Sequence, residues 1–150
     1  MTGGPEALVR RLIEDGFNRG DLAVCDELIA DDMAEHQDFG PGHARGAGGV
    51  KAVIASLRRA FPDFHLAIEA TAVDGGTVWL RMTGTGTNHG PFMGNPPTGR
   101  PMRVHVFDVL RVEDGRIVEH WGVPDRLGAL VQLGLARPPA AAGGREAARV

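Results

Sequence analysis

The chain has 150 residues, 43% hydrophobic and 23% charged, with a formal net charge of −3. This is typical of one soluble domain and gives no reason to expect nucleic acid or a membrane as a partner. No apolar run is long enough to span a bilayer, and we expect no signal peptide at MTGGPEALVRRL. The single cysteine, Cys25, excludes an internal disulfide and a cysteine-rich metal site, so we expect a cytoplasmic protein.

Helices are predicted in the first half of the chain. Apolar residues repeat at helical spacing in PEALVRRLIEDGFNRGD (5–21), DLAVCDELIADD (21–32) and GVKAVIASLRRAFPD (49–63). Pro62 ends the last of these helices. The intervening MAEHQDFGPGHARGAGG (33–49) has no periodicity and is predicted to be a loop.

The hydrophobic period becomes two in the second half, which predicts strands. Two hairpins are expected from four alternating segments: FHLAIEATAV (64–73), TVWLRMTGTGT (77–87), MRVHVFDVLRV (102–112) and RIVEHWG (116–122). NHGPFMGNPPTGRP (88–101) lies between the hairpins and is too rich in Gly and Pro for a strand. Helical spacing returns at 124–134.

Helices followed by a run of strands predict an α+β fold. We expect a cone-shaped, curved antiparallel sheet wrapped on the N-terminal helices, with a small-molecule pocket inside the cone. Residues 1–135 are predicted to form this domain. Residues 136–150 have almost nothing to bury and are predicted to be a disordered tail.

Asp108 and His120 are the first candidates for chemistry. Asp108 shares an otherwise apolar strand face with neighbours such as Val106. A three-residue hairpin loop at 113–115 would pair Asp108 with His120 on that face, whereas a two-residue loop would put them on opposite faces. Such a pair suits general acid/base catalysis. The alternative is that the two side chains only satisfy each other as a buried polar pair.

Five further residues are predicted to bind a substrate. His36 follows the second helix and is expected to reach the mouth of the cone, and Asn88 borders the Gly/Pro-rich loop as a hydrogen-bond donor. Phe92 and Met93 are predicted to form an apolar lid, and Val106 lines the pocket. A surface position for His36, and plain loop anchoring by Phe92 and Met93, are the alternatives. None of the six histidines has metal-site spacing, so no metal is expected.

Three segments together resemble the SnoaL-like polyketide cyclases of the nuclear-transport-factor-2-like superfold. They are LVRRLIEDGFNRGDLAVCDELIADDMAEH (8–36), GTNHGPFMGNPPTGRP (86–101) and GRIVEHWGVPDRLGALVQLG (115–134). The resemblance implies a cone-shaped barrel, a deep apolar pocket and a homodimer packed through the sheet. It also implies a cofactor-free intramolecular aldol closure, as in the last ring of an anthracycline precursor, and hence a small, apolar, carbonyl-rich substrate.

The same resemblance makes Gly122 a departure from the family pattern. The cyclases' motif I-x-x-H-x-D matches Ile117 and His120 but puts its acid/base aspartate at Gly122, which also makes Gly122 a candidate substrate contact. The cyclases' pocket histidine on the preceding strand falls on Asp108. Either the acid and the histidine have exchanged strands here, or the site has lost its acid and Gly122 makes room for a ligand.

We therefore predict a cofactor-independent enzyme that performs an acid/base, aldol-type cyclisation or isomerisation. Asp108 and His120 would move a proton next to a carbonyl. The alternatives are a non-catalytic ligand-binding or partner subunit of a biosynthetic enzyme, and an epoxide-hydrolase-like activity. Gly122 favours a binding role, whereas a buried carboxylate at Asp108 would bring an apolar carrier no benefit.

Overall fold

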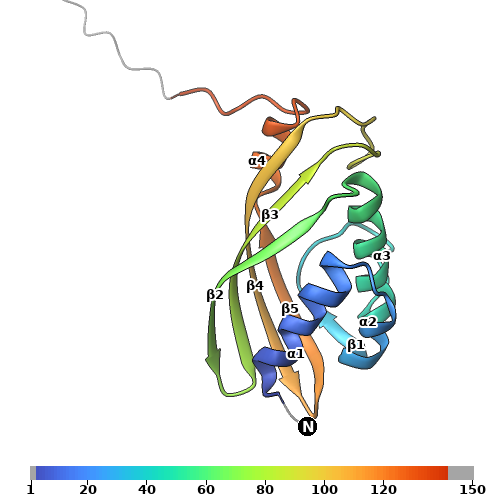
Figure 1. Cartoon of the computed structure of the whole chain (residues 1–150), viewed down its shortest axis with the longest axis vertical. Helices are drawn as coiled ribbons and strands as arrows, with labels where there is room; N and C mark the ends of the chain where they lie inside the picture. The colour runs from blue at the N-terminus through green and yellow to red at the C-terminus, as the bar shows by residue number, and fades with distance from the viewer. Residues whose placement is uncertain (1–2, 142–150) are drawn as a thin grey trace, which may run out of the picture.

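Five strands form one strongly curved sheet in the computed structural model, which describes residues 3–141 (Figure 1). The strand order is β1-β5-β4-β3-β2. The strands are β1 (Ile29–Glu35), β2 (His65–Asp74), β3 (Thr77–Thr87), β4 (Pro101–Glu113) and β5 (Arg116–Pro124). The helices are α1 (Pro5–Arg11), η1 (Leu12–Asn18), α2 (Ala23–Leu28), α3 (Gly46–Ala60) and α4 (Arg126–Gln132). The predicted α+β class and the curved sheet around N-terminal helices are confirmed.

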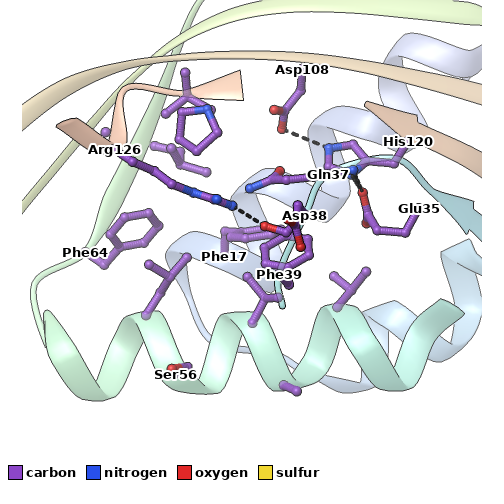
Figure 2. Close-up of a pocket in the computed structure, with 18 of the residues that line it drawn as sticks. Phe17, Glu35, Gln37, Asp38, Phe39, Ser56, Phe64, Asp108, His120 and Arg126 are labelled. Carbon is purple, nitrogen blue, oxygen red and sulfur yellow. Dashed lines mark hydrogen bonds and ion pairs between the residues drawn. The ribbon is translucent and has the colours of Figure 1, made fainter. Parts of the chain in front are cut away.

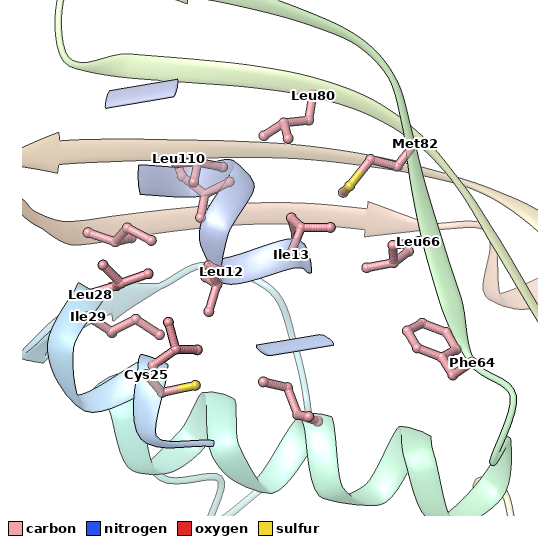
Figure 3. Close-up of a cluster of buried hydrophobic side chains, with 14 of the residues drawn as sticks. Leu12, Ile13, Cys25, Leu28, Ile29, Phe64, Leu66, Leu80, Met82 and Leu110 are labelled. Carbon is pink, nitrogen blue, oxygen red and sulfur yellow. The ribbon is translucent and has the colours of Figure 1, made fainter. Parts of the chain in front are cut away.

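The core lies between the concave face of the sheet and these helices (Figure 3). The first predicted helix is divided into α1 and the π-helical η1, where Ile13 points toward Leu80 and Met82 of the sheet and Leu12 points the other way, toward α2 and α3. These side chains are almost fully buried. Burying apolar surface in this way favours folding by about 25 cal/mol per Å².

The strand β1 corrects the sequence analysis, which predicted the end of a helix followed by a loop in this region. β1 pairs in parallel with β5, so the sheet is mixed and not wholly antiparallel. Only Ile29 and Met33 of β1 are buried, and acidic residues separate them. That leaves too little alternation for the strand to be recognised locally. The pairing sets Glu35 opposite His120.

The β4–β5 hairpin also differs from its prediction. Its turn has two residues, Asp114 and Gly115, with φ values of 49° and 75°, as in the primed turns that suit hairpins. A β-bulge follows, because Val112 pairs with Ile117 while Arg111 pairs with Glu119. The bulge's extra residue restores the inward face that the short turn would have reversed.

The predicted direct pairing of Asp108 with His120 is therefore wrong. Asp108 lies opposite Gly122, and His120 lies opposite Leu110, two residues away on the same inward face. Asp108 and His120 are diagonal neighbours, still within side-chain reach.

The end of the chain is described only in part. Residues 136–141 form no helix or strand, and residues 142–150 of the predicted disordered tail lie outside the described residues. None of the helices within residues 3–141 combines the length and apolar composition that crossing a bilayer requires.

Candidate active site

A cavity of about 790 Å³ lies between the concave face of the sheet and α3 (Figure 2). Its wall is mainly apolar and includes Phe17, Phe39, Phe64, Val104, Val106 and Leu110. Four polar side chains meet in one part of it: Glu35, Gln37, Asp108 and His120. An apolar wall around a few polar groups is typical of a small-molecule site, and it strengthens the electrostatic interactions inside.

His120 lies between two carboxylates. Its Nδ1 is 2.7 Å from Oε1 of Glu35, and its Nε2 is 3.5 Å from Oδ2 of Asp108. The three side chains are 11–15% exposed. β1 supplies Glu35 through its pairing with β5, and β4 supplies Asp108 through the diagonal position. We call Glu35, His120 and Asp108 the acid–histidine cluster.

The two carboxylates determine the charge of His120. Burial alone would lower the pKa of the imidazole, but Asp108 and Glu35 outweigh it and raise the pKa from 6.5 to about 9. His120 is therefore an imidazolium at neutral pH and offsets part of the negative charge of its neighbours. The other oxygen of Asp108, Oδ1, lies near Gly122 and the Gln37 carboxamide, and Asp108 lines the cavity.

Glu35→Gln is expected to lower the pKa of His120. A nearby opposite charge typically shifts a pKa by about one to three units. Without the Glu35 carboxylate, the pKa of His120 should therefore fall from about 9 toward neutrality. In the wild-type protein, kcat/KM should fall as pH rises through about 9, and the variant should show this loss at lower pH. NMR titration of the His120 ring and a pH profile of kcat/KM measure the two effects.

The raised pKa of His120 also determines how folding stability changes with pH. Because the folded-state pKa of His120 is raised, its contribution to stability is fully present below pH 6.5 and is lost as pH rises through about 9. Thermal unfolding of Glu35→Gln should be less sensitive to pH between these values. An unchanged His120 titration in the variant would contradict the assigned role of Glu35.

Three other predicted binding residues lie where the sequence analysis expected them. Val106, Phe92 and Met93 all line the cavity. Phe92 packs edge-on against Phe61 at a centroid distance of 5.1 Å, while Met93 is 55% exposed. Their contact with a substrate stays a prediction.

His36 does not reach the cavity, which corrects its predicted position. Its ring stacks on Trp121 at 4.6 Å on the outer side of the sheet, and its Nε2 lies 2.8 Å from Oε2 of Glu119. The physical reason is the alternation of strand β1, which turns Glu35 inward and His36 outward.

Asn88 does not line the cavity either. Its side chain is fully buried, donates to the Gly90 carbonyl at 2.8 Å and accepts from the Thr98 N–H at 2.8 Å. These bonds organise the Gly/Pro-rich loop. Asn88 thus lies within the loop and not at the cavity, which corrects its predicted position.

Glu35, Gln37 and His43 also line the cavity, and none of them was predicted from the sequence. His43 lines the cavity and stacks with Phe39 at 4.6 Å. The alternation Glu35-His36-Gln37 would have been informative only if β1 had been recognised as a strand. Asp125 caps α4, since its Oδ1 accepts the N–H of Gly128 at 2.8 Å.

Comparisons with known proteins identify the family. The model of the SnoaL-like polyketide cyclases matches residues 7–133. The chain belongs to the SnoaL-like polyketide cyclase family. It is 31% identical over 137 residues to the aklanonic acid methyl ester cyclase DauD of Streptomyces sp. strain C5. The aligned region covers 85% of this chain and 80% of DauD.

Two further relatives agree. The nogalonic acid methyl ester cyclase of Streptomyces nogalater is 27% identical to this chain over 120 residues. The aligned region covers 79% of this chain and 89% of that cyclase. The crystal structure of IdmH from Streptomyces antibioticus superposes with a TM-score of 0.76 at 37% identity, covering 88% of this chain and 99% of that one. Membership in this family confirms the predicted resemblance and fold, and it supports the predicted polyketide cyclase function.

Proposed function

We propose that this protein is a cofactor-independent cyclase that closes a ring of a polyketide-like substrate by intramolecular aldol addition. The observation that carries the proposal is the acid–histidine cluster, in which the largely buried carboxylate of Asp108, only 15% exposed, lines a mainly apolar cavity. A carboxylate in such a place is a general base.

The proton transfers balance without a second reagent. Asp108 Oδ1 takes the proton from a carbon next to a carbonyl, and the electron pair left behind forms an enolate. The enolate carbon then bonds to a second carbonyl carbon of the same molecule, whose oxygen becomes an alkoxide. Asp108 returns its proton to this alkoxide, so the product is an isomer of the substrate. The positive charge on His120 stabilises both anions.

The proposed substrate class is a fused-ring, carbonyl-rich polyketide ester. A cavity of about 790 Å³ accommodates a molecule of several rings, and the apolar wall suits aromatic carbons. Two of the relatives carry the names of cyclases for aklanonic acid methyl ester and nogalonic acid methyl ester. These compounds are the natural first substrates to test.

A turnover assay with these two methyl esters tests the proposal. We expect cyclised product without added metal or organic cofactor, detected by mass-neutral changes in retention time and absorbance. Tight binding of an ester with no conversion would replace the proposal with the second candidate, a subunit that presents ligand to another enzyme. Gly122 favours that candidate, since the acid of the family motif is absent there. No binding of either ester would overturn both.

We also propose that two copies pack through the outer face of the sheet. Large apolar side chains are exposed there: Trp79 (54%), Phe107 (52%), Trp121 (38%) and Val123 (70%). Contiguous exposed apolar surface typically marks an interface. Phe107→Glu should convert the dimer to a monomer in sedimentation velocity, and a monomeric wild-type protein would refute the pairing.

Because Cys25 is buried and is the single cysteine of the chain, a reducing cytoplasm suits the protein.

A further inference from the structure

The space that a side chain at Gly122 would occupy is filled by Gln37. A Cβ built on Gly122 would overlap Oε1 of Gln37 and would lie 2.9 Å from both Oδ1 of Asp108 and Cε1 of His120. Real Cβ atoms do not approach other heavy atoms this closely. The glycine therefore does not leave a gap beside Asp108, because a carboxamide from another part of the chain lies there.

The backbone on both sides of this carboxamide is held in place. The N–H of Gln37 donates to Oε1 of Glu35 at 2.9 Å, the same oxygen that lies 2.7 Å from Nδ1 of His120. On the other side, the carbonyl of Asp38 accepts from Nη2 of Arg126 at 2.6 Å. The position of Gln37 is thus coupled directly to the acid–histidine cluster.

The side chain of Gln37 has hydrogen-bonding capacity to spare. Within residues 3–141, the hydrogen bond that Gln37 makes uses its backbone N–H, and its carboxamide has no protein partner. Figure 2 shows the amide nitrogen directed away from His120, into the cavity. An amide offers two N–H donors and no charge.

We propose that Gln37 binds the reacting carbonyl oxygen of the substrate through its Nε2–H and stabilises the enolate or alkoxide that forms beside Asp108. Both ring nitrogens of His120 already face carboxylates, and Asn88 is buried in its own loop. Ser56 and Arg126 lie on other sides of the cavity (Figure 2). This inference rests on the proposed function, since it assigns the donor for the anion of the same reaction.

Gln37→Met is the decisive variant, because methionine keeps the length of the side chain and removes the donors. Loss of one oxyanion donor typically costs about 10²–10³ in kcat, so we expect a fall of that size in kcat with a much smaller change in KM. Aklanonic acid methyl ester is the substrate for this measurement. Circular dichroism and the melting temperature check that the variant is folded.

Infrared spectroscopy gives a readout that does not depend on turnover. Methyl anthraquinone-2-carboxylate serves as an unreactive carbonyl probe. A hydrogen bond from Gln37 lowers its ring C=O stretching frequency, so the band should move to higher frequency in Gln37→Met. A residue that only fills space would leave the band unchanged.

Gly122→Ala supplies a second test through the infrared band. Its methyl group takes the place of the Gln37 carboxamide, so the C=O band should shift as in Gln37→Met, and the double variant should add little to that shift. The kcat of Gly122→Ala does not report on Gln37 alone, because the same methyl group would lie 2.9 Å from Oδ1 of Asp108.

The outcomes separate this inference from the proposed function. If the wild-type protein neither binds the probe nor converts the ester, the proposed function fails, and the role of Gln37 with it. If the wild-type protein converts the ester and Gln37→Met matches it in kcat and in the C=O band, the inference alone is wrong.

Discussion

Replacing Asp108 with asparagine is expected to abolish turnover while substrate binding persists. The amide has nearly the same shape as the carboxylate but cannot accept the proton next to the carbonyl. General-base catalysis contributes roughly 10²–10⁴-fold, and kcat should fall by that factor. Single-turnover kinetics measure the chemical step, and quenching of tryptophan fluorescence measures the dissociation constant.

Asp125→Asn is a matched control for the loss of a negative charge. Asp125 also lines the cavity, but its carboxylate caps α4, a role that asparagine performs equally well. This variant should retain kcat within about twofold, since it removes charge from the wall without removing the base. If Asp108→Asn also retained kcat, the base would have to be another group, and Glu35 would be the next to replace.

The β4–β5 hairpin shows what the sequence pattern could and could not predict. The alternation of apolar residues put Asp108 and His120 on the same face of the sheet, which the structure confirms. The loop length was wrong by one residue, and the bulge beside Val112 introduced a further shift of one residue. The two shifts add to two residues. An even shift leaves each side chain on its predicted face, but it moves the partner of Asp108 from His120 to Gly122.

The role of β1 could not be predicted from local pattern. Its pairing with β5 joins residues more than eighty positions apart, and its acidic residues give no alternating signal. Glu35 and Gln37 were missed for this reason, and His36 was assigned to the wrong side. The sequence showed that Gly122 replaces the aspartate of the family motif, but it did not show that the Gln37 carboxamide lies in the space of that side chain. The cavity thus combines one part that a hairpin pattern predicts with one that only tertiary contacts reveal.

Asn88→Ala is expected to cost roughly 2–5 kcal/mol of unfolding free energy, a large effect for one polar residue. Truncation leaves the part-buried Thr98 N–H and the buried Gly90 carbonyl without the hydrogen bonds that Asn88 supplies. A buried donor or acceptor left unpaired costs about 1–3 kcal/mol, and two are affected here. Urea unfolding followed by circular dichroism measures the loss.

Asn95→Ala is the control on the same loop. Asn95 also donates to loop carbonyls, those of Phe92 at 3.2 Å and Met93 at 3.1 Å, but close to solvent at the exposed tip, where water replaces lost bonds. Its substitution should cost less than about 1 kcal/mol. The contrast also separates the two roles considered for Asn88. A donor to substrate would raise KM in Asn88→Ala at unchanged stability, whereas a loop-organising residue lowers stability first and changes KM only through disorder of the cavity wall at Phe92.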